Sequence, residues 1–465
     1  MKNYDVVVIG AGPGGYVAAI RAAHHGLKTA IVEKDKKLGG TCLLRGCIPT
    51  KSLLHSADVY SELQEAKSHG VLADNVRLDF DGVQKARTKV ITKSAAGVAY
   101  LMKQNKIDVI KGMGRLKNGN TVEVSGGDDG DVTLNAKYVI LATGSVPRAI
   151  PPAPIDGEYF ITSNEMLELK EPPKSLIVLG AGAVGVEFAS VYARFGTECT
   201  IVEMLDRALP NEDREVSAEF EKALKKRGIN CLTGHKLEKA EVKDGMVHAT
   251  ISDTNGSKTL EAEKLLVAVG RAPVTENLGL KEAGVKVDQG GFVEVDEYLQ
   301  TTIKGVYAIG DIIRTPQLAH TASAEAMLAV DHVAGKLVEP INYLHNPGAT
   351  YADPEVASVG LTEEAAKEKG YTIKIGKYPF SALGKARILG KSEGFVKIVA
   401  DAQYDEILGV HIIGPHATDL IAEAVLALRM ECTTEELART IHAHPTLPEA
   451  MLEAAHGANG RPIHL

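Results

Sequence analysis

Two cysteines, Cys42 and Cys47, lie five positions apart in the stretch GGTCLLRGCIPTK, in a chain that has only five cysteines. A regular α-helix would hold their Cα atoms about 8 Å apart, whereas a disulfide requires a separation of about 4.4–6.8 Å. A bond between these two cysteines therefore demands a distorted turn. Such a pair could bind a metal, staple the fold, or exchange electrons with a substrate.

The cysteine spacing and its surroundings favour a redox-active pair. Zinc would need four ligands, usually with a second close pair, and Cys199, Cys231 and Cys432 are scattered along the chain. A structural disulfide is disfavoured in a reducing compartment. The run from Ile48 onward predicts a helix, and a helix N-terminus stabilises a thiolate. Lys51 adds a cation close to the pair.

A dithiol relay also needs a base that accepts a proton from the attacking thiol. The stretch HAHPTLPEAM supplies His444, directly before Pro445, with Glu449 five positions later. Histidine can shuttle a proton near neutral pH, and a carboxylate can fix its tautomer. On this stretch alone, a loop histidine without a catalytic role is the competing interpretation, and we expect the neighbouring His442 to be structural.

The elements that position these residues include two copies of one pattern. DVVVIGAGPGGYVAAIRAAHHGLKTAIVEK, from Asp5, aligns without a gap with SLIVLGAGAVGVEFASVYARFGTECTIVEM, from Ser175, at an offset of 170 residues. Each copy predicts a strand, a glycine-rich turn, a helix and a second strand that ends in an acid, Glu33 or Glu203. The turn glycines are Gly10, Gly12 and Gly15 in the first copy and Gly180, Gly182 and Gly185 in the second.

This context is the one that a dinucleotide-binding turn requires. The first glycine permits the tight turn, the second lets a pyrophosphate approach the backbone, and the third allows close helix packing. The diphosphate then lies at the helix N-terminus. Because Glu203 would repel a 2′-phosphate and no arginine follows it, the second site should prefer NAD to NADP. The competing interpretation, two glycine-rich turns without ligands, is disfavoured by the repetition.

Three further apolar runs mark the ends of strands. The runs Tyr138–Pro147 and Leu265–Pro273 bracket the second copy, which indicates a second domain between them. A third run ends at Asp311 and precedes a helix predicted from Leu318 to about Val333. On its own, Asp311 could bind a hydroxyl-bearing ligand or simply cap the next turn.

Composition limits the class of protein. The chain has 465 residues, which predicts two to four domains, and its hydrophobic and charged contents of 45% and 24% are those of an ordinary globular protein. The net charge of −8 without a basic block argues against nucleic acid as a partner. No signal peptide or membrane-spanning run is recognisable, so we expect a cytoplasmic protein that does not bind a membrane.

With these motifs in order, the sequence resembles the pyridine nucleotide disulfide oxidoreductases along essentially its whole length. The resemblance rests on GAGPGG, GGTCLLRGCIPTK, GAGAVGVEFA, AVGRAP, AIGD and HAHPTLPE. It implies an α/β fold class with two Rossmann-like dinucleotide-binding domains plus a C-terminal α+β dimerisation domain. The implied domains are 1–148 for FAD, 149–271 for NAD, 272–341 as a central segment that completes the FAD site, and 342–465 for dimerisation.

The resemblance also assigns cofactor contacts, residue by residue. On the FAD side it implies Glu33 on the adenosine ribose, Lys51 near the flavin ring, Gly114 near the adenine, Asp311 on the ribityl chain, and further contacts from Thr143 and Gly144. Ala319 would open a helix whose positive end faces the flavin. On the NAD side it implies Glu203, Gly270 and Arg271, with Glu187 pairing with Lys51.

The branch of the family that it resembles most oxidises dihydrolipoyl groups on a carrier protein and reduces NAD. Cys47 would lie nearest the flavin, Cys42 would exchange with substrate, and His444 with Glu449 would be the acid–base pair. The histidine would reach the cysteines of the other subunit, which implies a homodimer. The partner would be a lipoyl-bearing acyltransferase subunit of a 2-oxo acid dehydrogenase complex or a glycine cleavage carrier. Alternatives are an NAD(P)H-dependent reductase of another disulfide such as glutathione, or a mainly docking role.

The chain departs from the common pattern of the family at a few positions. Leu44 and Arg45 stand between the cysteines where the family usually has Asn and Val, and Thr50 stands where serine is usual. Arg45 could lower nearby thiol pKa values or merely face solvent. Ala352 and Asp353 replace a more usual Thr and His, and the sequence offers no physical reason for that change.

Overall fold

The computed structural model describes residues 2–127 and 130–464. Contacts within the chain group it into two compact units. The first unit contains residues up to Leu53 together with Asp81–Arg148 and Gly270–Tyr343, and the second contains Leu54–Phe80, Ala149–Val269 and the chain from Leu344 onward. The α/β class expected from the sequence is confirmed, whereas the expected division into four domains stays a prediction.

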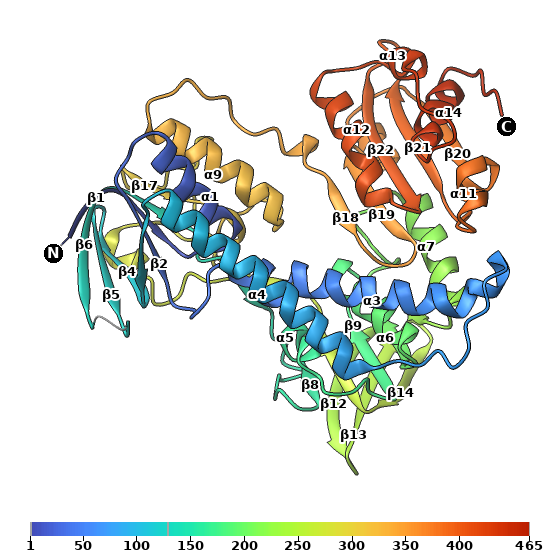
Figure 1. The fold of residues 1–465 in the computed structure, drawn as a ribbon, viewed down its shortest axis with the longest axis horizontal. Helices are drawn as coiled ribbons and strands as arrows, with labels where there is room; N and C mark the ends of the chain where they lie inside the picture. The colour runs from blue at the N-terminus through green and yellow to red at the C-terminus, as the bar shows by residue number, and fades with distance from the viewer. Residues whose placement is uncertain (1, 128–129, 465) are drawn as a thin grey trace. The chain divides into compact units, whose positions relative to one another are not determined.

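The first unit is built on a seven-stranded sheet with the order β3-β2-β1-β6-β5-β4 and β17 paired to β6 (Figure 1). The helices α1 (Pro13–His24) and α9 (Ala319–Val333) lie side by side in this unit. The parallel strands are β1 (Lys2–Ile9), β2 (Thr29–Glu33), β3 (Asp108–Lys111), β17 (Val306–Ala308) and the end of β6 (Val132–Leu141), and the antiparallel strands are β4 (Met113–Asn118) and β5 (Thr121–Ser125).

The apolar runs of the sequence form the centre of this sheet. Val6, Val7 and Val8 on β1 are fully buried, as are Val139 and Ile140 on β6. Strands covered on both faces read as continuous apolar runs because every side chain lies in the core. The unit also holds a two-stranded sheet of β7 (Ser145–Pro147) and β16 (Arg271–Pro273) and the short α8 (Leu280–Ala283).

The second unit repeats the same nucleotide-binding plan. Its five-stranded sheet has the order β11-β10-β9-β15-β8 and is parallel throughout, and α6 (Ala183–Arg194) follows β9. The strands are β8 (Phe160–Ile161), β9 (Ser175–Leu179), β10 (Glu198–Val202), β11 (Asn230–Leu232) and β15 (Lys264–Val267), and α5 (Ser163–Leu167) lies between β8 and β9 in the sequence. An antiparallel sheet contains β12 (Lys236–Lys243), β13 (Met246–Asp253) and β14 (Gly256–Ala262).

The C-terminal part of this unit is an antiparallel sheet with helices packed against it. The strand order is β18-β19-β22-β21-β20, and every residue of β21 and β22 is buried. The strands are β18 (Gly348–Thr350), β19 (Glu355–Gly360), β20 (Ile373–Pro379), β21 (Phe395–Asp401) and β22 (Ile407–Gly414), and the helices are α10 (Glu363–Glu368), α11 (Gly384–Ile388), α12 (Ala417–Arg429), α13 (Thr434–Arg439) and α14 (Glu449–Ala458).

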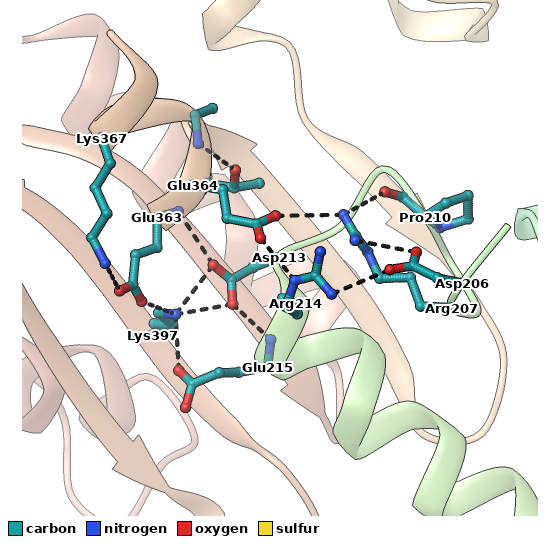
Figure 2. A network of polar contacts seen from close by, with 12 residues as sticks. Asp206, Arg207, Pro210, Asp213, Arg214, Glu215, Glu363, Glu364, Lys367 and Lys397 are labelled. Atoms are coloured by element: carbon teal, nitrogen blue, oxygen red, sulfur yellow. Dashed lines mark hydrogen bonds and ion pairs between the residues drawn. The ribbon is translucent and has the colours of Figure 1, made fainter. Parts of the chain in front are cut away.

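A buried lysine joins this sheet to the nucleotide-binding part of the same unit (Figure 2). Lys397 on β21 has a side chain that is 1% exposed, and its Nζ lies 3.0 Å from Asp213, which caps α7 (Arg214–Lys226). The same ammonium lies 2.7 Å from Glu363 at the start of α10 and 2.8 Å from Glu215. Burying a charge is costly unless it is paired, so the carboxylates and the ammonium hold one another in place.

Two long helices each have residues in both units. The helix α3 (Cys47–Glu65) begins at the second cysteine, and α4 (Phe80–Gln104) is 25 residues long. The sequence prediction of a helix after the cysteine pair is therefore confirmed. In the part of the chain that the structure describes, no helix combines the length and apolar character needed to cross a membrane.

Candidate active site

The first glycine-rich turn has the geometry of a dinucleotide-binding turn. Gly10 has φ of +102°, which an L side chain rarely adopts, and a Cβ on Gly15 would lie 1.9 Å from the Gly10 carbonyl oxygen. The Glu33 carboxylate accepts hydrogen bonds from Ala11 N at 2.8 Å and Asp35 N at 2.8 Å. Burial raises the pKa of Glu33, although the Ala11 hydrogen bond and nearby lysines act against this.

The second turn reproduces these contacts closely. Gly180 has φ of +98°, and a Cβ on Gly185 would lie 2.0 Å from the Gly180 carbonyl oxygen. Glu203 accepts hydrogen bonds from Ala181 N at 2.7 Å and from Leu205 N at 2.8 Å. The offset of 170 residues read from the sequence thus corresponds to two equivalent turns, each with its acid fixed beside the helix start.

The two cysteines lie across a break between two helices. The helix α2 (Gly40–Arg45) ends at Gly46, whose φ of −141° and ψ of −113° interrupt the helical path before α3 begins at Cys47. The interruption is the distorted turn that the spacing requires. The side chain of Cys42 is hydrogen-bonded to that of Cys47.

The environment of Cys42 controls its ionisation. The hydrogen bond with Cys47 is the main cause that raises the pKa of the Cys42 thiol, and burial and the charge of Cys47 raise it further. The Lys51 ammonium, one turn along α3 from Cys47, lowers this pKa. Arg45 forms an ion pair with Asp35 and so has a partner in the first unit.

Asp311 lies at the centre of a polar cluster in the first unit. It belongs to the short 3₁₀ turn η2 (Gly310–Ile312), directly after β17. The Ser145 hydroxyl donates a hydrogen bond to its carboxylate, and Arg271 donates from Nε to the Ser145 hydroxyl at 2.6 Å. Burial lowers the pKa of Arg271, whereas the charge of Asp311 raises it. Sequence reasoning missed Ser145.

The remaining residues assigned to the flavin side lie in the same unit. Thr143 donates its hydroxyl to Val274 O at 2.6 Å, and Gly144 adopts φ of +73°. Gly114 is buried on β4, where a Cβ would meet Ile9 at 3.0 Å and Val32 at 3.1 Å. Ala319 is the first residue of α9, as the sequence predicts. Gly270, which the resemblance assigns to the NAD side, also lies in this unit; it has φ of +106°, and its carbonyl oxygen accepts from Arg148 N at 3.0 Å.

Glu187 and Asp353 fix the start of the C-terminal sheet to α6 and α7. Glu187 is 4% exposed and accepts a hydrogen bond from Tyr351 N at 2.9 Å. Asp353 receives two hydrogen bonds from the Arg227 guanidinium, at 2.7 and 3.0 Å. Burial would raise the pKa of Asp353, but Arg227 outweighs it and lowers the pKa. This ion pair gives the departure at position 353 a physical reason.

The acid–base pair proposed from the sequence is assembled within the second unit. His444 Nδ1 lies 2.8 Å from the Glu449 carboxylate, and Thr446 N donates to the same carboxylate at 2.7 Å. Because a carboxylate only accepts, Nδ1 carries the proton and Nε2 remains available as a base. Burial would raise the pKa of Glu449, but these hydrogen bonds lower it. The His444 side chain is 79% exposed.

His442 has a different environment from His444. Its side chain is 5% exposed, and Nε2 lies 2.8 Å from Glu423 on α12. Its Nδ1 lies 2.8 Å from Thr440 O. With both ring nitrogens bound inside the chain, His442 has no nitrogen available for a substrate, as its expected structural role requires.

The residues present fit two dinucleotides. The middle glycine of each turn has no side chain at the place where a pyrophosphate would approach the backbone. The carboxylate oxygen of Glu33 or Glu203 that accepts one backbone amide has a further lone pair, which can accept a hydrogen bond from a ribose hydroxyl. In the first unit, Asp311 and the dithiol add a hydroxyl acceptor and a redox couple. These features define a dinucleotide-dependent dithiol oxidoreductase.

Comparison with known proteins identifies the family of oxidoreductases to which the chain belongs. Residues 4–326 match the model of the pyridine nucleotide-disulphide oxidoreductase family, and residues 346–455 match the dimerisation domain of that family. The chain belongs to this family and is an oxidoreductase that uses FAD and NAD. The second match supports a homodimer.

Relatives and solved structures agree along the whole chain. It is 48% identical to a dihydrolipoyl dehydrogenase from Bacillus subtilis, over 99% of both chains. It is 41% identical to the mitochondrial dihydrolipoyl dehydrogenase of Pisum sativum, over 99% of this chain and 92% of the relative. LpdA from Mycobacterium tuberculosis superposes with a TM-score of 0.91 at 27% identity, covering 98% of this chain and 99% of the other.

Proposed function

We propose that the chain is a dihydrolipoamide dehydrogenase, which oxidises dihydrolipoyl groups to the disulfide and reduces NAD. The observation that carries the proposal is the Cys42–Cys47 thiol pair at a helix start beside Lys51, in a chain with two dinucleotide turns. Relatives named dihydrolipoyl dehydrogenase, 41–48% identical over nearly the whole chain, support this substrate.

The thiol exchange steps follow from the residues. In the oxidised enzyme, a substrate thiolate attacks Cys42 Sγ, the Cys42–Cys47 bond breaks, and Cys47 leaves as a thiolate. The second substrate thiol then attacks the substrate sulfur bound to Cys42, which releases the cyclic disulfide and leaves the enzyme as a dithiol. His444 Nε2 accepts the proton of the attacking thiol, while Glu449 holds Nδ1–H.

The cofactors complete the redox balance. Bound FAD would supply the acceptor for the electron pair of the dithiol, and NAD would supply the final hydride acceptor. Per turnover, one dihydrolipoyl group and one NAD⁺ give one disulfide, one NADH and one proton. Lys51 supports the thiolates electrostatically in this proposal, and Glu187 is proposed to pair with Lys51.

The homodimer and the carrier extend the proposal. His444, exposed in the single chain, would serve the cysteines of the other subunit, as the family resemblance implies. The carrier would be a lipoyl-bearing protein of a 2-oxo acid dehydrogenase complex or of glycine cleavage. We also propose a cytoplasmic location, because Cys199, Cys231 and Cys432 form no disulfide, which suits a reducing compartment. Cell fractionation with an antibody tests this location.

Steady-state assays with paired variants test the reaction. The wild type should oxidise dihydrolipoamide with NAD⁺ and show little reduction of glutathione disulfide with NADPH. Cys42→Ser should abolish dihydrolipoamide oxidation, whereas Cys231→Ser, a matched control at another partly buried thiol, should retain it. Normal turnover by Cys42→Ser, or preference for glutathione disulfide, would refute the proposal.

A second pair of variants tests the base. His444→Gln should lower dihydrolipoamide oxidation by about 10²–10⁴-fold while electron transfer from NADH to an artificial acceptor persists. His248→Gln is the matched control, because His248 lies 3.3 Å from Glu261 on the surface of the same unit. Equal loss of both activities in His444→Gln would show that the histidine is not the base.

A further inference from the structure

A fully buried glutamate that the reaction does not use lies next to the flavin side of the first unit. Glu325 is in the middle of α9 and is 0% exposed. Its carboxylate accepts a hydrogen bond from Gly310 N at 2.6 Å and another from the Tyr343 hydroxyl at 3.0 Å. Glu325 therefore links α9 to the start of η2 and to the C-terminal end of this unit.

The turn that Glu325 holds is the one that presents Asp311. Gly310 has φ of +72°, and a Cβ there would meet the Ala322 side chain on α9 at 3.2 Å. Ser145 and Arg271 fix the far side of this turn through the Asp311 carboxylate. The Gly310 N–H is the contact that fixes the turn from the α9 side, and its acceptor is Glu325.

An ionised carboxylate is energetically unfavourable at a fully buried position such as 325. Burial raises the pKa of Glu325, and the charge of Asp311 raises it too, so both disfavour an ionised glutamate here. An apolar side chain would fill the same volume without that cost. What an apolar side chain cannot provide is an acceptor for the Gly310 N–H and the Tyr343 hydroxyl, since buried donors without partners are destabilising.

We propose that Glu325 is a positioning residue of the flavin site, which holds the 310–312 turn so that Asp311 meets the ribityl hydroxyls of FAD. The inference rests on the flavin site of the proposed function and not on the identity of the disulfide substrate. Tyr343 orients the second carboxylate oxygen and is a minor member of the same arrangement.

Release of FAD from the holoenzyme tests this role. Glu325→Met removes both acceptor oxygens at similar size and should speed FAD release by about 10-fold. Glu325→Gln should stay within about 3-fold of wild type, because its carbonyl oxygen can accept from Gly310 N while its amide donates to the Tyr343 oxygen. Glu282→Met is the control, since Glu282 is an exposed acid of the same unit.

Two readouts separate positioning from general stability. FAD release is followed by the recovery of flavin fluorescence, and the melting temperatures of holoenzyme and apoenzyme are compared. The increase in melting temperature that FAD provides should shrink in Glu325→Met, because weaker binding gives less stabilisation. A structural role alone would lower both melting temperatures and leave their difference unchanged.

A milder variant covers the case in which Glu325→Met does not fold. Glu325→Asp keeps the carboxyl group but draws it back by one methylene from Gly310 N, so FAD release should again be faster. Release at the wild-type rate from folded Glu325→Met, or from Glu325→Asp if the former does not fold, would overturn the inference. A wild type that binds no FAD would instead refute the proposed function itself.

Discussion

The two glycine-rich turns have the same internal geometry but different coverings. A later segment of the chain is hydrogen-bonded to each turn: Gly39 N donates to Ala11 O at 2.9 Å, and Leu209 N donates to Ala181 O at 2.9 Å. The segment comes closer in the first copy, where a Cβ on Gly40 would lie 2.5 Å from the Gly12 Cα atom. A Cβ on Gly182, the equivalent of Gly12, would meet no atom within 4 Å. The first turn is thus covered more closely than the second.

The helices that follow the two turns, α1 and α6, differ in the same way, because the start of α1 is packed more closely than the start of α6. Gly14 on α1 is buried, and a Cβ there would meet Ala322 O on α9 at 3.2 Å. The equivalent residue of α6, Val184, is 39% exposed. Close packing against α9 leaves little room for a Cβ at position 14. Nothing comparable restricts position 184.

This difference teaches how one folding pattern serves two kinds of ligand. The family contains FAD and depends on NAD, and NAD that has been reduced must leave before the next turnover. The turn and its acid have the same geometry in both copies. We therefore expect the segments packed over each turn, rather than the repeated pattern itself, to determine how easily the ligand exchanges.

An ion pair connects distant segments within each unit, and these two pairs, here called braces, differ in burial. In the first unit, Arg21 on α1 pairs with Asp331 on α9, and these side chains are 38% and 20% exposed. In the second, Lys397 pairs with Asp213 at the start of α7, and these side chains are 1% and 2% exposed. Breaking a buried pair leaves an uncompensated charge, whereas an exposed pair is replaced by water.

The largest effect is expected at the buried brace. Lys397→Met should lower the free energy of unfolding by about 3–5 kcal/mol, because it leaves carboxylates buried without their cation. Urea unfolding of the holoenzyme measures this change. Lys367→Met is the matched control, since Lys367 pairs with Glu363 from a position that is 59% exposed. If Lys397→Met lowers the free energy of unfolding no more than the control does, the buried ion pair contributes little to stability.

Lowering the pH should weaken the Lys397–Asp213 ion pair without a mutation. Burial would raise the pKa of Asp213, but Lys397 and a backbone hydrogen bond hold it below its usual value, and the pKa of Glu363 is lowered as well. Carboxylates with lowered folded-state pKa values stabilise the fold above their unfolded pKa values of about 4. This stability is lost as the pH falls through the lower folded values. The pKa of Lys397 is raised, so its contribution is complete throughout this range.

Unfolding at several pH values measures this dependence. The free energy of unfolding of the wild type should fall as the pH drops from about 5 to 3, whereas Lys397→Met should show a weaker dependence because its carboxylates no longer have a cation to pair with. Parallel pH curves for the two proteins would contradict the assignment of the dependence to this cluster.

A substitution in the cover of the first turn tests the difference in ligand residence directly. Gly40→Ala places a methyl group against the Gly12 backbone, at a residue whose φ is +59°. The segment at Gly39 and Gly40 that packs over the first turn must then shift. FAD release should become about 10-fold faster or more, with the KM for NAD unchanged. Gly26→Ala is a control, because Gly26 also has positive φ but no atom within 4 Å of an added Cβ. Equal FAD release from both variants would show that the cover does not set residence.

The sequence predicts local parts of this molecule better than distant ones. Both nucleotide turns, the helix that starts at Cys47 and the His444–Glu449 contact follow from patterns within about 30 residues. The helix of the sequence prediction from Leu318 to about Val333 agrees with α9 to within one residue. Short-range geometry is fixed by backbone conformation and spacing, which a pattern records.

The polar clusters around the site could not be predicted in this way. Ser145 and Asp311 are 166 positions apart, and Asp213 and Lys397 are 184 apart. No periodicity connects such residues, because the topology of the sheets decides which of them meet. Glu325 carried one signal, since it is a charged residue among alanines in the helix predicted from Leu318 to about Val333, and an acid that is buried needs a partner.

The smallest effect is expected at the more exposed brace, the Arg21–Asp331 pair of the first unit. The Arg21 guanidinium lowers the pKa of Asp331, and His25 also donates to this carboxylate. Asp331→Asn should cost only about 0.5–1 kcal/mol of unfolding free energy, since water replaces much of the lost pairing. The cost should shrink in 1 M salt, where exposed charges are screened, whereas the cost of Lys397→Met should persist. Urea unfolding at low and high salt measures both. A cost for Asp331→Asn that equals that of Lys397→Met, and that salt does not reduce, would mean that burial is not what distinguishes the two braces.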